Sequence, residues 1–165
     1  MFRSFCCLAV WSLWIPAAHG AQVDSNPVSW SFEKPPVQGS IKAGATIRVV
    51  LNAEIREGWH LYSLKKMPSG GPIPTRITIP EGQAFKLDES KSITAPEPES
   101  VDDPVFGMEV EYFSGKAVFE LPVKVDAGAN GESSLKIAVR YQACNDKICL
   151  RPKTVLIETS LRVSP

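Results

Sequence analysis

Four stretches of the chain alternate strictly between apolar and polar residues, the pattern of strands that bury one face against a core. Every second side chain in them is apolar, so each would present one face to a core and the other to water. Shorter stretches of strand composition occur at residues 28–33, 75–79 and 108–113. The four long stretches are residues 45–55, 116–125, 133–142 and 153–163.

Turn-forming residues separate these stretches, and none of them shows a sustained apolar period of 3.6 residues. The 14 prolines further disfavour helices. Seven or more short strands divided by turns are typical of a two-sheet sandwich. The sequence therefore predicts an all-β fold, an immunoglobulin-like β-sandwich.

Two segments interrupt the strand pattern. Residues 64–75 are rich in proline and glycine and are predicted to form a loop. Residues 87–104 are acidic, contain prolines and show little strand character. Connections this long inside a compact domain are functional or disordered. Composition alone favours a solvated surface loop, but the segment leads directly into Val105, Phe106 and Gly107.

The N-terminus has the layout of a secretory signal peptide. Arg3 supplies a positive charge, an apolar stretch of 13 residues follows at 5–17, and Ala18 and Gly20 provide small residues for cleavage. We expect residues 1–20 to be removed, together with Cys6 and Cys7, leaving one domain over residues 21–165. An uncleaved membrane anchor is the alternative, and the proline at position 16 and the polar sequence that follows argue against it.

The full sequence has 18 basic and 18 acidic residues, and the predicted cleavage removes only one of them, Arg3. The predicted mature chain is therefore nearly neutral. No basic patch points to nucleic acid, and no second apolar run points to a membrane span. We expect a monomer. The chain retains Cys144, Cys149 and His60, in a compartment where disulfides form and persist.

The two cysteines lie in the segment YQACNDKICLRP, residues 141–152. In an extended strand, five steps would separate their Cα atoms by about 16 Å, whereas a disulfide needs roughly 4.4–6.8 Å. The chain must therefore reverse between them, and Asn145, Asp146 and Lys147 are suitable turn residues. The flanking strands would then form an antiparallel hairpin with the cysteines at its mouth.

Such a bond would be a weak staple. Closing a loop of six residues removes unfolded-state entropy worth roughly 2 kcal/mol, against about 4.7 for a hundred residues. Exchange chemistry is the other role, because Lys147 and Arg151 would favour a thiolate. The residues alone leave these two roles about even.

Metal binding is a third role for the cysteines. Cys144, Cys149 and His60 would supply three ligands, but a structural zinc site needs four, and no fourth appears. A packed or edge histidine is the ordinary explanation of His60.

Five motifs in order resemble the N-terminal periplasmic domain of the DsbD family of thiol:disulfide interchange proteins. They extend over roughly residues 28–163, and the cysteine segment is the most specific of them. A lone pair of cysteines at this spacing would be a weak signal, but five ordered motifs in a secreted all-β chain are strong. The motifs are GWHLYS (58–63), GPIPT (71–75), PEPE (96–99), DDPVFG (102–107) and YQACNDKICLRP (141–152).

The resemblance implies an immunoglobulin-like sandwich with one redox-active pair, Cys144 and Cys149, and no cofactor. Family domains receive electrons from a thioredoxin-like domain of the same protein. They pass them to thioredoxin-fold periplasmic proteins, including disulfide isomerases and cytochrome c maturation thioredoxins. The 165 residues hold no such thioredoxin-like domain and no membrane-embedded conduit, so we expect a separate protein as electron donor.

The resemblance also assigns roles to individual residues. Cys149 would attack the partner and Cys144 would resolve the mixed disulfide. A cap loop from Asp103 to Gly107 would shield the pair, with Val105 or Phe106 as the shielding side chain and Phe106 preferred. His60 and Tyr62 would border the site together with the cap loop.

The function that follows is periplasmic thiol:disulfide interchange through Cys144 and Cys149, of the protein-disulfide reductase type. The alternative is a non-catalytic secreted interaction module. In that module the same disulfide merely rigidifies a hairpin, and the loop at 87–104 or a sheet edge binds a partner.

Overall fold

A computed structural model describes residues 26–34, 37, 39–67 and 70–165 of the chain. Within these residues it contains strands, turns and loops and no helix. The described part accordingly offers no apolar helix that could cross a membrane. The predicted signal peptide, with Cys6 and Cys7, lies outside the described residues.

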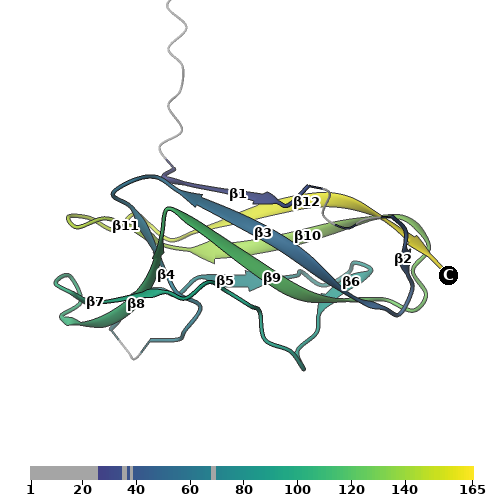
Figure 1. Cartoon of the computed structure of the whole chain (residues 1–165), viewed down its shortest axis with the longest axis horizontal. Helices are drawn as coiled ribbons and strands as arrows, with labels where there is room; N and C mark the ends of the chain where they lie inside the picture. Colours follow the sequence, from purple (N-terminus) through teal and green to yellow (C-terminus); the bar gives the residue numbers. More distant parts are fainter. Residues whose placement is uncertain (1–25, 35–36, 38, 68–69) are drawn as a thin grey trace, which may run out of the picture.

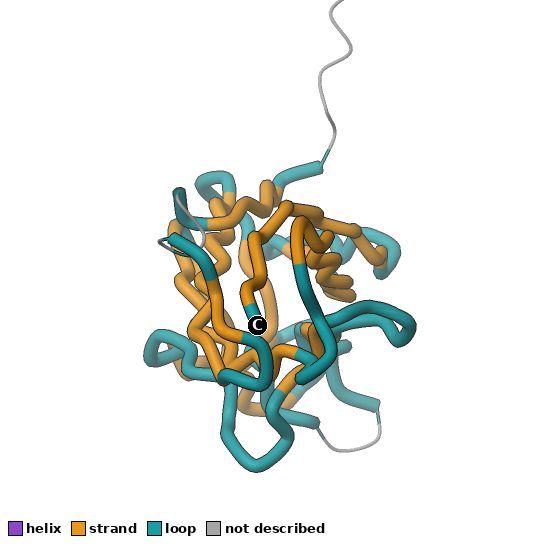
Figure 2. Tube along the Cα trace, turned by 90° about the vertical axis from the view of Figure 1, so that its right-hand side faces the viewer, coloured by secondary structure: helices purple, strands orange, loops and turns teal. Residues whose placement is uncertain are grey.

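Two four-stranded sheets form the body of the sandwich (Figure 1). Neighbouring strands are antiparallel, except that β2 runs parallel to β12. Viewed along the long axis, the strands surround the interior and the loops lie outside (Figure 2). The first sheet has the order β1 (Val28–Phe32), β3 (Thr46–Ile55), β9 (Lys116–Val125), β6 (Phe85–Leu87), and the second β2 (Ile41–Lys42), β12 (Lys153–Ser164), β10 (Gly131–Tyr141), β5 (Arg76–Thr78).

The core lies between these two sheets and is built from the alternating apolar positions. In β9 and β10, every residue of the predicted apolar face is buried. The same holds for β3, except that the first apolar residue of its face, Ile47, is half-buried. Phe119 lies at the centre, with its ring 5.6 Å from that of Trp30 and 5.4 Å from that of Phe113. All seven stretches predicted from the sequence are strands.

A third sheet lies at the end of the sandwich opposite the C-terminus (Figure 1). One face continues the main core, through the buried side chains of Leu61, Phe113 and Ala143, which are cross-strand partners. The other face points away from the core, because side chains alternate along each strand. The sheet has the order β11 (Ala143–Cys144), β4 (His60–Tyr62), β8 (Met108–Ser114), β7 (Glu99–Asp103).

The structure corrects one sequence prediction and sharpens another. Residues 87–104 were predicted to have little strand character, yet β7 pairs with β8 over five residues. The side chains of β7 are mostly polar, so the strand lacks the alternation of apolar and polar residues by which strands are predicted. Its pairing with β8 comes from backbone hydrogen bonds. The long hairpin of β10 and β12 forms as predicted. The chain leaves it after Tyr141, however, so that Cys144 joins the third sheet instead.

Replacing Phe119 with alanine tests the assignment of the core centre. The ring is fully buried, so Phe119→Ala is expected to lower the free energy of unfolding by about 3–5 kcal/mol. Urea unfolding followed by fluorescence measures this change. The neighbouring Val118, which is 38% exposed on the outer face, is the matched control. Val118→Ala should stay within about 0.5 kcal/mol of the wild type, and equal losses in both variants would contradict the assignment.

Candidate functional site

The cysteine turn, residues 144–149, closes with a disulfide between its first and last residues. The two cysteines face each other as an antiparallel bridge, with their Cα atoms 4.0 Å apart. Asn145 holds the reversal, because its side-chain Oδ1 accepts the backbone N–H groups of Lys147 and Ile148, each at 2.9 Å. This is the turn that the sequence predicted.

The two sulfurs occupy different environments. Cys144 belongs to β11 and is 1% exposed, whereas Cys149 is half-buried at the rim. Ile148, next to Cys149, is 53% exposed, an unusual position for a large apolar side chain. Lys147 and Arg151 are both exposed, so water and salt screen the charges expected to favour a thiolate. The disulfide therefore joins a buried residue to a half-buried one.

The cap turn, residues 103–107, connects β7 to β8 beside the cysteine turn. Asp103 is buried and holds this turn, since its Oδ1 accepts the N–H groups of Val105 at 2.8 Å and Phe106 at 3.3 Å. Gly107 has a φ of +62° and donates its N–H to the carbonyl of Asp103 at 2.7 Å. A side chain at Gly107 would strain that conformation.

Among the side chains of the cap turn, Phe106 is the one that packs against the cluster to which Cys144 belongs. Phe106 and Cys149 both pack against a small apolar cluster formed by Tyr62, Val110 and Cys144. The Phe106 ring meets that of Tyr62 edge to face, with centroids 5.8 Å apart. Val105, the other candidate, is 55% exposed and does not belong to this cluster. The geometry thus favours Phe106 over Val105 as the shielding residue.

Tyr62 connects the cap turn to the floor of the site. Its hydroxyl donates to Asp103 Oδ2 at 2.9 Å, and its ring is buried beside Cys144. Burial, followed by the hydrogen bond to Asp103, raises the pKa of Tyr62 well above its ordinary value. The hydroxyl therefore keeps its proton and acts as a donor that fixes Asp103.

His60 lies on the same face of β4, two residues before Tyr62. Its ring stacks on Tyr112 with centroids 4.5 Å apart, and its Nε2 is 3.5 Å from the Tyr62 hydroxyl oxygen. Burial is the largest influence on its pKa, which falls below the ordinary value despite the nearby carboxylates of Asp103 and Asp146. The imidazole is therefore neutral at neutral pH.

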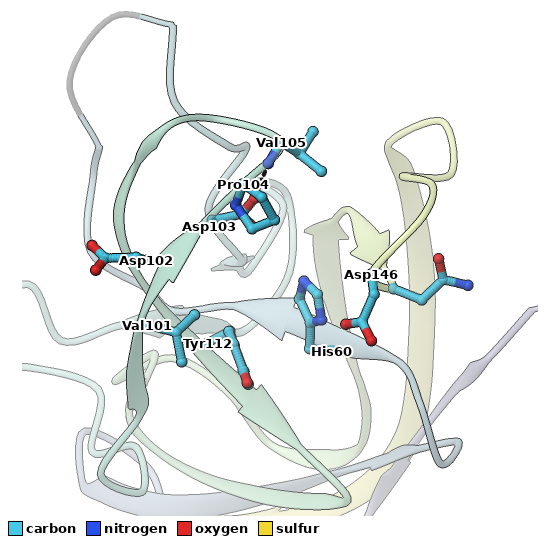
Figure 3. A pocket seen from close by; sticks show the side chains of 9 residues that line it. His60, Val101, Asp102, Asp103, Pro104, Val105, Tyr112 and Asp146 are labelled. Carbon is cyan, nitrogen blue, oxygen red and sulfur yellow. Dashed lines mark hydrogen bonds between the residues drawn. The ribbon is translucent and has the colours of Figure 1, made fainter.

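A cavity opens between the cap turn and the cysteine turn, with His60 at its base (Figure 3). Pro104 and Val105 lie on one side of it and Asp146 on the other, as Figure 3 shows. The structure thus brings together every predicted site residue: the two cysteines, His60 and Tyr62 on the floor, and the cap turn above. Trp59, by contrast, packs against the main core.

Sequence reasoning missed Tyr112, Val110 and Met108 of β8, which line the site face. Their alternation was visible in MEVEYF, but the pattern gave no reason to place this strand beside the cysteines. Asp146 was noted only as a turn residue. No three His, Cys, Asp or Glu side chains in the described part of the chain are grouped as metal ligands.

Comparison with known proteins identifies a family whose model matches most of the chain. The family model described as "Thiol:disulfide interchange protein DsbD, N-terminal" matches residues 32–161. The solved N-terminal domain of DsbD from Neisseria meningitidis, in the reduced form, has a TM-score of 0.50 and 17% identity, covering 73% of this chain and 82% of that one. This likeness confirms the predicted immunoglobulin-like β-sandwich.

A second solved structure, the N-terminal periplasmic domain of ScsB from Proteus mirabilis, has a TM-score of 0.49 and 13% identity. The match covers 82% of this chain and 45% of that one. No curated protein sequence matches this chain significantly.

Removing the Phe106 ring is expected to speed reduction of the disulfide by a small thiol. An edge-to-face ring contact is worth about 0.5–1.5 kcal/mol beyond its buried area, so opening of the cap turn should become about twofold to tenfold more frequent in Phe106→Ala. Alkylation of freed cysteines after timed exposure to dithiothreitol measures the rate. Val105→Ala is the matched control and should react like the wild type. If Val105→Ala alone reacts faster, Val105 and not Phe106 shields the disulfide.

Proposed function

The chain belongs to the family of N-terminal domains of the thiol:disulfide interchange protein DsbD, and from this premise we propose that it passes electrons to thioredoxin-fold partners through Cys144 and Cys149. The family performs thiol:disulfide interchange. What is proposed is that this chain does so with these two residues, and that the partners reach them at the end of the sandwich.

The observation that carries the proposal is the position of the disulfide. It joins two residues of one turn and ties no strands across the two sheets. A loop this short adds only about 2 kcal/mol of stability in the chain-entropy model. Yet Cys144 and Cys149 share one apolar cluster with Tyr62 and Phe106. A bond of little structural value in so organised a setting supports a chemical role over the alternative of a rigidified hairpin.

The unequal burial of the sulfurs supports a division of labour. Cys149, at the rim, attacks a sulfur of the partner's disulfide as a thiolate, forming a mixed disulfide and releasing the other partner sulfur as a thiolate. Cys144 then attacks Cys149, the mixed disulfide breaks, and the second partner sulfur leaves. The partner gains two electrons and the domain is left with the Cys144–Cys149 bond.

The surroundings of the pair supply a surface for a protein partner. Val105 on the cap turn and Ile148 on the cysteine turn are both more than half exposed, and they flank the site. Large exposed apolar side chains are typical of interaction sites when they gather in one place. A thioredoxin-fold protein that covers them would displace the cap turn and reach Cys149.

A periplasmic location completes the proposal. The predicted signal peptide exports the chain, and an oxidising compartment allows the disulfide to form and persist. A separate protein would then reduce the domain. Disulfide isomerases and cytochrome c maturation thioredoxins are the acceptors that the family resemblance suggests.

The reduction potential of the pair distinguishes electron transfer from a structural bond. We expect a value above about −300 mV, because structural disulfides of secreted proteins lie below that value. Equilibration of the folded protein in thiol redox buffers, followed by alkylation and mass measurement, gives the potential. A bond that opens only when the protein unfolds would support the interaction module instead.

Single cysteine variants test the order of attack. Cys144→Ser retains the attacking Cys149 and should accumulate a mixed disulfide with a disulfide-containing thioredoxin-fold protein, because nothing resolves it. Cys149→Ser retains only the buried sulfur and should trap at least about tenfold less, since thiolate exchange depends on access. Non-reducing electrophoresis followed by mass spectrometry measures both yields. Preferential trapping by Cys149→Ser would reverse the assignment.

A further inference from the structure

The buried position of Cys144 creates a requirement for a proton acceptor. A thiol attacks a disulfide only as the thiolate, and apolar surroundings raise the pKa of a buried thiol. Cys144 is 1% exposed and packs against Tyr62 and Val110. Its resolving step therefore depends on a nearby group that takes its proton.

His60 is positioned to be that group. In the pairing of β4 with β11, His60 and Cys144 are direct cross-strand partners. Side chains of directly opposed residues extend from the same face of a sheet, with Cβ atoms about 4.5–5.5 Å apart. Of the two histidines in the sequence, His60 is the one in the described part of the chain.

We propose that His60 accepts the proton of the Cys144 thiol while Cys144 attacks the mixed disulfide on Cys149. This inference rests on the proposed function, in which Cys144 resolves. In the step, the Cys144 S–H bond breaks and its proton moves to the imidazole. The Cys144–Cys149 bond forms, the bond from Cys149 to the partner sulfur breaks, and that sulfur leaves with the electron pair. Charge balances as an imidazolium and a thiolate.

The groups around His60 suit both of its protonation states. Tyr62 of β4 and Tyr112 of β8 contact the ring and are uncharged. Negative charge faces it from Glu99 of β7, from Asp103 of the cap turn and from Asp146 of the cysteine turn. Burial keeps the imidazole neutral and able to accept a proton, and the three carboxylates stabilise the imidazolium that results.

Asp103 is the other candidate acceptor near the pair, but its oxygens are already engaged. Oδ1 accepts the two N–H groups of the cap turn, and Oδ2 accepts the Tyr62 hydroxyl. Protonation of Asp103 would weaken the contacts that hold Phe106 over the disulfide. His60 makes none of the hydrogen bonds to Asp103 that hold the cap turn, so protonation of His60 leaves those bonds in place.

A chromogenic disulfide separates the two chemical steps. The reduced protein, purified after export and checked by mass for two cysteines, is mixed with a deficit of 5,5′-dithiobis(2-nitrobenzoate). Attack by Cys149 releases the first thionitrobenzoate, at a rate that depends on protein concentration. Attack by Cys144 releases the second from the mixed disulfide, at a rate that does not. Cys144→Ser, which should release only the first, defines the background.

The test compares the wild type with His60→Phe, which keeps a planar ring, and with His60→Gln, which keeps polarity. Both variants lack a proton acceptor at neutral pH. We expect the second release to slow about 100-fold or more in both, while the first release stays within about twofold, because its attacking sulfur lies at the rim.

The pH profile distinguishes proton transfer from a packing role. In the wild type the second release should level off above the pKa of His60. In both variants it should keep rising about tenfold per pH unit and approach the wild-type rate at alkaline pH, where hydroxide removes the thiol proton. A slower second release with an unchanged profile overturns the inference, as does a wild-type rate in either variant. A folded wild type that releases no thionitrobenzoate at all instead overturns the proposed function.

Discussion

The pairing of two residues of β11 with β4 is the interaction on which the rest of the site depends. The chain leaves the long hairpin after Tyr141 and hydrogen-bonds Ala143 and Cys144 to Leu61 and His60. Ala143 and Leu61 face the main core and are almost fully buried, so apolar burial fixes the register. Because side chains alternate, the same register turns Cys144 and His60 to the opposite face. Packing of the main core thereby fixes the position of Cys144 on the opposite face of the same sheet.

A second constraint couples the cap turn to this platform. The buried carboxylate of Asp103 satisfies two backbone N–H groups of its own turn and the hydroxyl of Tyr62. Such a charge is costly to bury unless it is hydrogen-bonded. Its three partners make one position of the turn favourable, with Phe106 inward and Val105 outward. Moving the turn away would break the bond from the Tyr62 hydroxyl, whereas the two N–H bonds lie within the turn and can move with it.

The sandwich could be predicted from the sequence because its strands are long and bury one face, as in β3, β9 and β10. The third sheet could not, because its strands are short and β7 is mostly polar. Periodicity also carries no information on which strands are neighbours, so Tyr112 was not connected with the cysteines. Asn145 was found because turn chemistry is local. The preference for Phe106 over Val105 came from the family resemblance, and the structure adds that Phe106 packs against the cluster of Cys144 while Val105 is exposed.

Burial of one sulfur and exposure of the other reconcile protection with reactivity. A pair exposed at both sulfurs would react with any small thiol, and a pair buried at both would react with no protein. In the proposed function, a partner large enough to displace the cap turn reaches Cys149, which is half-buried beside the same cluster as Phe106. The cost falls on Cys144, whose thiolate is disfavoured by its apolar surroundings. In the mechanism we propose, His60, which is opposite Cys144 in the same sheet, offsets that cost during the resolving step and leaves the resting disulfide unchanged.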